Sequence, residues 1–307
     1  MQNPGIFKEP SKNLVIAAFA AVYLIWGSTY IGILLAIKTI PPFIMAGIRF
    51  FASGIILYMW CLAKGEKTPG ISSVSKNALS GTLMLFFGTT SLIWVEQFLP
   101  SGLCAIVVAA VPLWFVILDK KNWSINFSDK FIIIGLLVGF VGIMLLFSGK
   151  SSVDLQNKAS QLTAFIVLII SGVLWAIGSL YSKYTITSGS TLMKGSIQMI
   201  AAGVCGFITA LIAGEYHGFH LQQVSAQSWE AVVYLVFMGS IVGYTAYIWL
   251  LDVRPPSLVG TYAYVNPVVA VFLGWLFVGE TITMRQCGAL LIVLIGVLLV
   301  NFSKYKK

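Results

Sequence analysis

Apolar positions fill ten long segments of this chain almost without interruption. Each segment holds roughly 18 to 24 residues, the length that an α-helix needs to cross a bilayer core of about 30 Å. Runs this continuous predict helices, because backbone N–H and C=O groups cannot stay unpaired in hydrocarbon and the alternation typical of barrel strands is absent. The predicted helices are residues 14–37, 42–63, 77–97, 101–118, 131–148, 161–183, 191–213, 229–250, 257–278 and 284–302.

The composition agrees with a protein that lives in a membrane. Hydrophobic residues make up 58% of the 307 residues and charged residues only 9%, whereas a soluble domain carries about 25% charged residues. No soluble fold could bury so much apolar surface. The sequence therefore predicts an all-α integral membrane protein with ten transmembrane helices in a lipid bilayer.

Basic residues outnumber acidic ones by 19 to 10 and gather in the short loops between the apolar segments. If the N-terminus is cytoplasmic, thirteen of them face the inside and four face the outside. The positive-inside rule then predicts a multi-pass protein of the inner or plasma membrane with both termini in the cytoplasm. This role accounts for the positive charge, so no nucleic-acid partner is expected. The inside set is Lys8, Lys12, Lys64, Lys67, Lys76, Lys120, Lys121, Lys130, Lys183, Arg254, Lys304, Lys306 and Lys307, and the outside set is Lys38, Lys150, Lys158 and Arg285.

The second half of the chain repeats the first. Trp26 and Trp175 are 149 residues apart, and the same offset aligns residues 47–54 with residues 196–203, where Ile, Ala and Gly coincide. We therefore predict two five-helix units, residues 1–148 and 161–307, joined by a linker at 149–160. Because five is an odd number of crossings, the second unit is inverted. Inverted repeats are a recurring plan of secondary transporters, with the substrate site near the midplane between the halves.

A family resemblance covers almost the whole chain and rests on the order and spacing of six short pieces. They resemble the drug/metabolite transporter (DMT) superfamily with two EamA-type domains, and residues 94–97 ahead of 100–102 resemble its YedA-type exporters. The resemblance implies ten helices, cytoplasmic termini and export or exchange of small metabolites such as amino acids and their relatives. The pieces are Trp26-Gly27-Ser28-Thr29-Tyr30, Ile48-Arg49-Phe50, Pro100-Ser101-Gly102-Leu103, Val111-Pro112-Leu113, Asn266-Pro267-Val268 and Gly279-Glu280-Thr281.

One of these pieces departs from the repeat. Glu280 follows the ninth predicted helix, whereas Asp119, Lys120 and Lys121 follow the fourth. Any role of Glu280 is therefore not expected to be shared by symmetry.

Arg49 and Glu96 are two charged residues that fall within the apolar segments. Arg49 lies about seven residues into the second predicted helix, and a charge near a helix centre costs roughly 2.5 to 3.5 kcal/mol, so a partner is expected. The predicted topology puts Glu96 in the same outer half of the membrane and makes it the predicted ion-pair or water-linked partner. Arg49 could bind a substrate carboxylate and Glu96 could carry a coupling proton. Alternatively the pair only fixes two helices, or Glu96 reaches interfacial water.

Three more candidates lie in helix interiors. Gln198 occupies the place of Arg49 in the second half, where it could contact substrate or hydrogen-bond across helices. Trp26 and Trp175 lie away from the headgroup belts where Trp is enriched, so they are candidate cavity walls. Ordinary packing against lipid or core is the alternative for both.

Two prolines lie near the middle of corresponding helices. Pro112 and Pro267 match at an offset of 155, and each removes a backbone hydrogen bond. Helices broken at matching positions point to a transport site. Tyr262, Tyr264 and Asn266 surround the second break and could stack on and hydrogen-bond a small amphipathic solute. A packing kink without ligand contact is the alternative.

Catalytic and cofactor motifs are absent from the sequence. There is no phosphate-binding loop, and the two histidines, His217 and His220, share an outside loop with Glu215, too few ligands for a metal site. Four cysteines lie in apolar segments without a CxxC pair. We therefore expect no metal, no cofactor and no enzymatic activity.

These observations predict a secondary active transporter that exports small metabolites, amino acids or related amphipathic compounds, by alternating access, with proton coupling through Glu96 as a hypothesis. A passive facilitator or channel would show rings of like polar residues, and a lipid-modifying enzyme would cluster catalytic groups at one interface. A monomer could enclose the pathway, and a homodimer is the alternative. The candidate substrate-binding residues are Trp26, Arg49, Glu96, Trp175, Gln198, Tyr262, Tyr264 and Asn266, with Pro112 and Pro267 as helix breaks.

Overall fold

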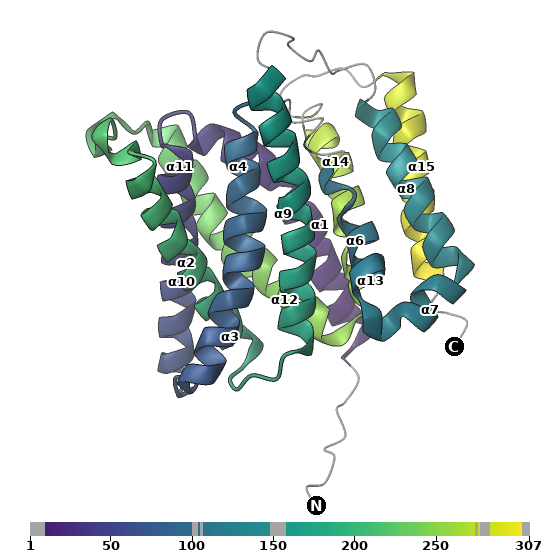
Figure 1. Ribbon diagram of the computed structural model, residues 1–307, viewed down its shortest axis with the longest axis horizontal. Helices are drawn as coiled ribbons and strands as arrows, with labels where there is room; N and C mark the ends of the chain where they lie inside the picture. Colours follow the sequence, from purple (N-terminus) through teal and green to yellow (C-terminus); the bar gives the residue numbers. More distant parts are fainter. Residues whose placement is uncertain are drawn as a thin grey trace, which may run out of the picture.

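The structure is a computed structural model that describes residues 10–99, 104, 107–147, 158–273, 276 and 283–302. Over these ranges the regular structure is helical, without a strand, and the long helices form one bundle (Figure 1). The all-helical prediction is confirmed. Most of the predicted linker, residues 100–103 and the stretch Gly279-Glu280-Thr281 lie outside the described residues.

Each predicted apolar range contains helix in its described residues. The helices are α1 (Lys12–Ala36), α2 (Pro42–Ala63), α3 (Ile71–Gly81), π-helix η1 (Thr82–Thr90), α4 (Ser91–Val95), α6 (Val111–Leu118), α7 (Trp123–Ser128), α8 (Lys130–Phe147), α9 (Lys158–Tyr184), α10 (Thr191–Ile212), α11 (Ala226–Tyr234), π-helix η6 (Leu235–Tyr244), α12 (Thr245–Val253), α13 (Pro256–Val259), α14 (Tyr262–Leu273) and α15 (Met284–Phe302). Short 3₁₀ turns are η2 (Lys120–Asn122), η4 (Glu215–His217) and η5 (Leu221–Gln223).

Seven helical segments in the described part of the chain are long and apolar enough to cross a membrane. Three of them are composite: α3, η1 and α4 continue one another, α11, η6 and α12 do so as well, and α13 and α14 together make the span Pro256–Leu273. A bent pair, Lys120–Ser128 with Lys130–Leu146, would be an eighth span, and α15 is a shorter apolar helix. Several membrane-spanning helices are therefore present, and the count of ten crossings stays a prediction.

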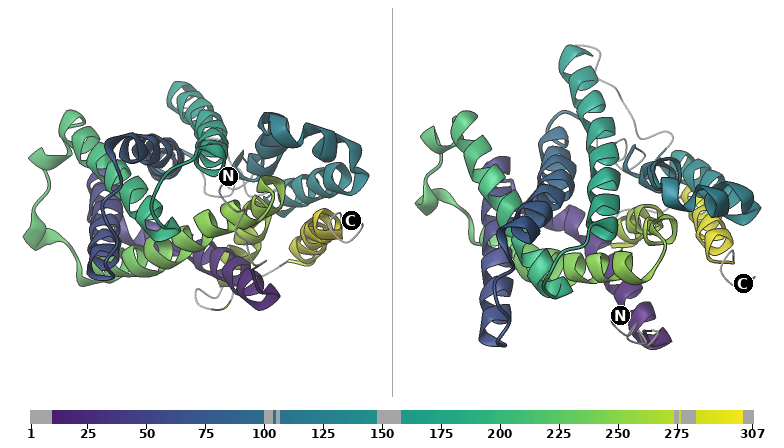
Figure 2. Two further views of the ribbon diagram at one scale, coloured as in Figure 1. Left: turned by 90° about the horizontal axis from the view of Figure 1, so that it is seen from below. Right: turned by 60° about the horizontal axis from the view of Figure 1, so that its bottom comes forward.

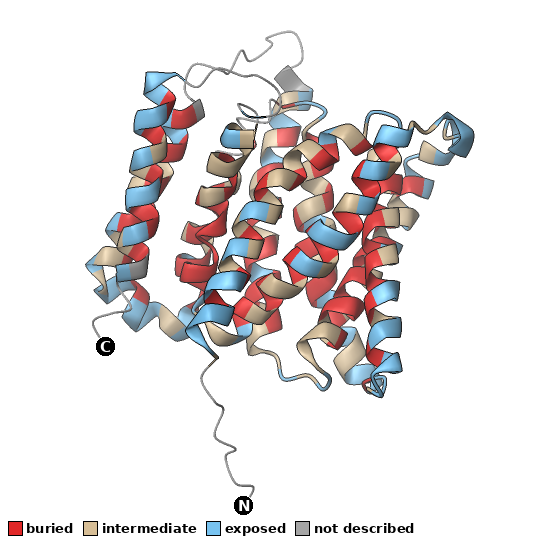
Figure 3. Cartoon of the chain, turned by 180° about the vertical axis from the view of Figure 1, so that it is seen from behind, coloured by how far each residue is buried: buried red, intermediate tan, exposed pale blue. Residues whose placement is uncertain are grey.

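The outer faces of the bundle carry large apolar side chains. Leu24, Ile134 and Leu291 are each at least half exposed, and Figure 3 shows exposed positions on outward faces and buried positions on inward ones. A soluble monomer rarely exposes apolar surface on this scale, so these faces suit lipid. The end-on view of Figure 2 shows α8 and α15 together at one edge of the bundle.

Helices that correspond in the repeat pack on one another: α2 lies against α10, and α8 against α15. Glycines allow the close approach. A Cβ on Gly54 would lie 2.7 Å from the Ile200 backbone nitrogen, and one on Gly296 of α15 would lie 2.5 Å from the Gly139 backbone nitrogen of α8. On α10, Gly203 lies directly against the backbone of Phe51.

The segments that follow α2 and α10 connect the two halves in the same way. Gly65 and Gly214 have φ of 85° and 73°, the left-handed conformation that favours glycine after a helix. The next residue, Glu66, accepts hydrogen bonds from the Ser190 hydroxyl and backbone N–H at the start of α10. Glu215 accepts two backbone N–H groups from the first turn of α2, at 3.2 and 2.9 Å. Both residue pairs are 149 apart, so each half caps a helix of the other.

The central helices repeat this relation. α1 contacts α11, η6 and α14, and its counterpart α9 contacts α3, η1 and α6, the corresponding elements of the first half. The π-helices η1 and η6 also lie at matching positions, in the third helix of each half. These correspondences support two inverted repeats in which α1 and α9 occupy equivalent positions.

Candidate transport site

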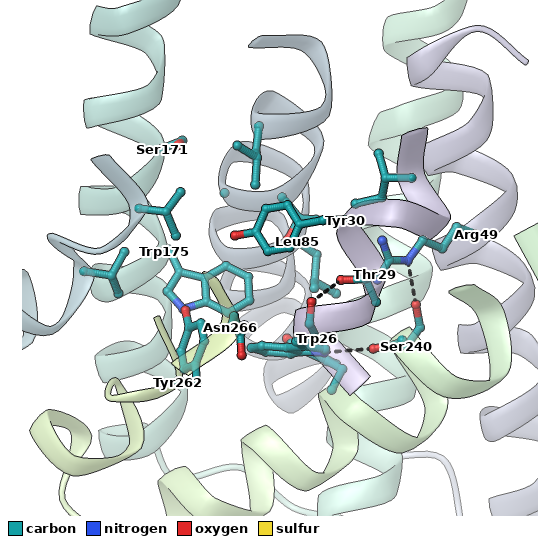
Figure 4. A pocket seen from close by; sticks show the side chains of 18 of the residues that line it. Trp26, Thr29, Tyr30, Arg49, Leu85, Ser171, Trp175, Ser240, Tyr262 and Asn266 are labelled. Carbon is teal, nitrogen blue, oxygen red and sulfur yellow. Dashed lines mark hydrogen bonds between the residues drawn. The ribbon is translucent and has the colours of Figure 1, made fainter. Parts of the chain in front are cut away.

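A cavity of about 100 Å³ lies where the central helices of the two halves meet (Figure 4). The first half lines it with residues of α1, α2, η1, α4 and α6, and the second half with residues of α9, η6 and α14. Hydroxyl groups line the wall at Thr29, Tyr30, Thr89, Ser171 and Ser240. A void of this order admits a small molecule of a few heavy atoms.

Four aromatic rings, which we call the aromatic layer, pack together at one end of the cavity. They are Trp26, Trp175, Tyr247 and Tyr262. The Trp26 ring centroid lies 5.7 Å from that of Trp175 and 5.0 Å from those of Tyr247 and Tyr262. These distances are typical of favourable aromatic contacts. Trp26, Trp175 and Tyr262 also line the cavity, so the structure brings three of the predicted site residues together.

The direction of the helices shows which end the layer closes. Along α1, Trp26 precedes the lining residues Thr29 and Tyr30, and along the oppositely directed α9 it is Ser171 that precedes Trp175. The layer therefore bounds the cavity on the side where α1 begins. Figure 4 shows the same order, with Ser171 and Trp26 at opposite ends of the site.

Both indoles of the layer are fixed by hydrogen bonds. Trp26 Nε1 donates to the Gly239 carbonyl at 3.0 Å, and Trp175 Nε1 donates to the Tyr247 hydroxyl at 3.0 Å. The Ser179 hydroxyl lies 2.7 Å from the same Tyr247 oxygen. Tyr247 was not among the predicted residues, because its role depends on the packing of α12 against α9.

Two glycines of the π-helices make room for the indoles. A Cβ on Gly88 of η1 would lie 2.7 Å from the Trp175 ring, and one on Gly243 of η6 would lie 2.7 Å from Trp26 Nε1. π-Helical turns occur frequently at functional sites. The two glycines are 155 residues apart, the same offset as the prolines, and that spacing is the sequence signal that could have identified them.

Arg49 extends from α2 to the wall of the cavity and is only 4% exposed. Its Nε donates to the Ser240 hydroxyl of η6 at 3.0 Å, whereas Nη1 is buried and has no hydrogen-bond partner. A Cβ on Gly239 would lie 2.9 Å from Nη2, so a larger residue there would displace the guanidinium. Ser240 is a second functional residue that the sequence did not single out.

Arg49 and Glu96, both within the described residues, make no direct salt bridge, so the ion-pair form of the predicted partnership is wrong, and its water-linked form stays a prediction. Glu96 follows the last residue of α4, and its buried Oε2 has no hydrogen-bond partner. It lies one helical turn beyond Leu92, the last residue of α4 that lines the cavity, and away from the aromatic layer. Arg49 Nε bonds the Ser240 hydroxyl of η6 instead.

Gln198 does not line the cavity. It is fully buried, and its Nε2 donates to the hydroxyls of Ser80 at 2.8 Å and Ser182 at 3.0 Å. Its Oε1 accepts from the Tyr244 hydroxyl at 3.0 Å. These bonds join α10 to α3, α9 and η6, which corresponds to the interhelical alternative left open by the sequence.

The three polar residues predicted around the second break separate into two sets. Tyr262 and Asn266 line the cavity, and the Asn266 amide nitrogen faces the carbonyls of Tyr23 and Tyr262 at 3.2 and 3.1 Å. Tyr264 points the other way and donates to the Leu136 carbonyl of α8 at 3.0 Å. Residues four apart share a helix face and residues two apart do not, so Tyr264 could have been excluded.

The prediction that both matched prolines lie in the middle of a helix is correct for Pro267 and wrong for Pro112. Pro267 lies inside α14, but Pro112 is the second residue of α6, where its missing N–H costs no helical hydrogen bond. In the second half the helix is broken between α13 and α14. Backbone bonds there run three residues back, from Thr261 to Leu258 and from Ala263 to Gly260.

Beyond the aromatic layer, polar contacts join the end of α9 to its neighbours. The Lys183 ammonium donates to the carbonyls of Leu251 and Arg254 at the end of α12. Tyr184 donates to an Asp119 carboxylate oxygen after α6 at 2.8 Å. From the sequence, Lys183 was only one of the basic residues on the inside, and Asp119 was only a position at which the two halves differ.

Metal-binding clusters were not expected. In the described ranges no three His, Cys, Asp or Glu side chains come together in a way that could hold an ion. The four cysteines are free, and Glu215 is engaged with the start of α2.

Comparison with known proteins places this architecture in a family. The EamA-like transporter family matches the chain twice, over residues 13–153 and 162–302. The chain belongs to the EamA-like transporter family. This membrane transporter is 38% identical over 294 residues to the uncharacterized inner membrane transporter YedA of Escherichia coli (strain K12), covering 95% of this chain and 92% of YedA.

More distant similarities agree with EamA membership. The uncharacterized transporter YoaV of Bacillus subtilis (strain 168) is 23% identical over 94% of this chain and 97% of its own length. One protein of known crystal structure superposes with a TM-score of 0.75 at 15% identity, covering 96% of this chain and 99% of that one. At that identity the likeness concerns the fold alone.

Proposed function

We propose that this EamA protein is a secondary active transporter that exports small metabolites by alternating access at the central cavity. The observation that carries the proposal is that both halves line the cavity while the aromatic layer bounds it on one side. A carrier needs a site that is open to one side at a time. Amino acids and related amphipathic compounds fit a wall of rings and hydroxyls.

The proposed orientation of the protein in the membrane makes the aromatic layer a barrier on the cytoplasmic side of the cavity. With both termini in the cytoplasm of a cell whose inner or plasma membrane holds the protein, the layer and the Lys183 contacts lie on the cytoplasmic side of the cavity. For export they must part to admit solute and then close behind it. Because the two halves of one chain complete the cavity, we propose a monomer as the transporting unit.

A steric block of the cavity tests the proposal. In proteoliposomes loaded with amino acids, purines and small aromatic metabolites, the wild type should release a subset and show saturable counterflow. Gly172→Phe should reduce that flux more than about 10-fold, because Gly172 lines the cavity with no atom within 3.6 Å of its Cβ position. Gly288→Phe on α15 is the matched control, since a Cβ there meets nothing within 4 Å and lies outside the cavity.

The outcomes separate the alternatives. Flux without saturation or counterflow indicates a channel. Equal flux in Gly172→Phe and wild type contradicts transport through this cavity, and release of no solute by folded protein contradicts the transporter proposal.

Proton coupling through Glu96 is a separate part of the proposal. Its support is a carboxylate with one buried oxygen that no described residue satisfies, one turn from the cavity wall. An intramembrane carboxylate without a partner is a candidate proton carrier. Glu96→Gln should lose the acceleration by a pH gradient and keep counterflow. A full response to the gradient in Glu96→Gln rejects the coupling role.

A further inference from the structure

The cavity holds one positive charge that its own wall does not neutralise. Among the described residues that line it, Arg49 is charged and none is acidic. Glu96, the carboxylate predicted to compensate it, makes no salt bridge with it. A buried charge without a counter-ion is costly, so this arrangement favours a ligand that supplies the missing negative charge.

The guanidinium has one edge occupied and one edge free. Nε is satisfied by Ser240 at 3.0 Å, and Nη1 is buried without any hydrogen-bond partner. The remaining Nη1 and Nη2 donors are spaced to meet the two oxygens of a carboxylate. A lysine ammonium could not offer this planar pair.

The group is also held in place. Its central carbon lies 4.9 Å from the Phe50 ring centroid, and Nη2 approaches Gly239 so closely that a Cβ there would be 2.9 Å away. Figure 4 shows Arg49 on one side of the cavity, with Trp175 and Tyr262 on the other. A solute bound by its acidic end at Arg49 would therefore direct its other end toward the rings.

The rest of the wall discriminates against a positive charge on the solute. Its polar groups in the described lining are hydroxyls, an amide and the indoles of Trp26 and Trp175, and in the amide orientation that satisfies its hydrogen bonds the Asn266 nitrogen faces two carbonyls. An ammonium group would find no carboxylate there. A solute with an anionic end and an uncharged body therefore matches the cavity better than a zwitterion.

We propose that the cavity selects small organic monoanions, with the carboxylate on the Nη1 and Nη2 edge of Arg49 and the uncharged body against the aromatic layer. The inference rests on the proposed transport function and names its substrate class. It makes monocarboxylates better ligands than the amino acids of the same skeleton.

Isothermal titration calorimetry on the purified full-length protein in detergent tests this with matched ligands. One set is 3-phenylpropanoate, 3-phenylpropanamide, phenylalanine and 2-phenylethylamine, and a second set is butanoate, butanamide, 2-aminobutanoate and butylamine. In at least one set the carboxylate should bind about 10-fold or more tightly than the amide and the zwitterion, and the amine weakest.

The variant Arg49→Gln removes the positive charge with a side chain that the fold accommodates, so it distinguishes an effect of charge from an effect of misfolding. The second half carries glutamine at the equivalent position, Gln198, so this helix pair accommodates the side chain. The variant should bring the carboxylate within about 2-fold of the amide, and Arg49→Lys should retain part of the preference. Arg285→Gln, which removes a charge from exposed α15, is the control and should keep the full preference.

The inference is overturned if amide and carboxylate bind equally in the wild type, if the zwitterion or the amine binds tightest, or if the preference survives in Arg49→Gln. Binding of neither set also overturns it. Solute release in the proteoliposome assay is scored separately, so a protein that exports zwitterions and ignores monoanions keeps the proposed function and loses this substrate class.

Discussion

Arg49 and Gln198 occupy equivalent positions of the repeat, 149 residues apart, yet they serve different purposes. The Gln198 amide forms hydrogen bonds with Ser80, Ser182 and Tyr244, and the side chain does not line the cavity. Arg49 uses one nitrogen on a hydroxyl and presents the others to the cavity wall. At the residue scale the two halves therefore differ, because only the first half places a charged side chain at the cavity. The sequence showed that arginine and glutamine differ at this position, but it did not show which of them reaches the cavity.

Replacing Gln198 by leucine should affect stability more than transport. Three hydroxyls lose a buried partner, and interhelical hydrogen bonds in membranes are worth about 0.6 to 2 kcal/mol. The melting temperature in detergent should fall, while the KM of transport stays within about 2-fold of wild type. Arg49→Gln provides the contrast, with a raised KM. An unchanged melting temperature with a KM raised 10-fold or more would assign Gln198 to the substrate instead.

At the scale of elements, the third helix of each half carries a π-helix with a glycine against a tryptophan of the other half. This arrangement places Gly88 against Trp175 and Gly243 against Trp26. The space left by the missing side chains lets the indoles pack against the π-helices, where they line the cavity without filling it. Sequence periodicity predicted the helices. It could not predict the π-helical turns, because apolar residues continue through them unchanged.

Gly88→Ala should lower the transport rate about 10-fold or more. Its Cβ would overlap the Trp175 ring at 2.7 Å, and overpacking of this kind costs about 1 to 3 kcal/mol. Gly172→Ala is the matched control: it also lines the cavity, but its nearest contact would be an ordinary 3.6 Å, so its rate should remain close to wild type. Equal rates in the two variants would show that the glycine does not position Trp175.

The cap that Glu215 forms on α2 makes stability depend on pH. Burial raises the pKa of Glu215 above its ordinary value, and the hydrogen bonds from two backbone N–H groups only partly oppose this. The folded state therefore holds the proton to higher pH than the unfolded state, so the stability contributed by this group is present at low pH and is lost as pH rises through the folded pKa. Relative to Glu215→Gln, which does not titrate, the melting temperature of the wild type should fall from about pH 4 to about pH 7. A wild-type melting temperature that rises relative to the variant over this range would mean that the hydrogen bonds dominate.

At the scale of the whole molecule, closure of the cavity depends on contacts between elements far apart in sequence. The aromatic layer draws on α1, α9, α12 and α14. Just beyond it, Lys183 holds the end of α9 to the end of α12. In the proposed alternating-access cycle these contacts break together when the site changes sides, and their formation favours the conformation closed on the side where α1 begins.

Removing that bias should expose the interior from the same side. In a variant without its four native cysteines, Ser179→Cys introduces a thiol at a fully buried position of α9 between Trp175 and Lys183. Adding Lys183→Met should speed its labelling by a membrane-impermeant thiosulfonate about 5-fold or more, a population shift of about 1 kcal/mol. Lys183→Arg, which keeps donors for the carbonyls, should label as slowly as the parent. No change in Lys183→Met would contradict a closing role for these contacts.

The sequence by itself determined the membrane class, the helical segments and the repeat that makes Trp26 and Trp175 equivalent. These follow from the length of apolar runs and from spacing, which are properties of the chain alone. Only the tertiary structure decided that Arg49 bonds Ser240 rather than Glu96, that Gln198 is structural and that Tyr264 faces α8. A polar side chain in hydrocarbon takes whichever partner the packing of other helices brings within 3 Å or so, and that packing depends on residues far away in the chain.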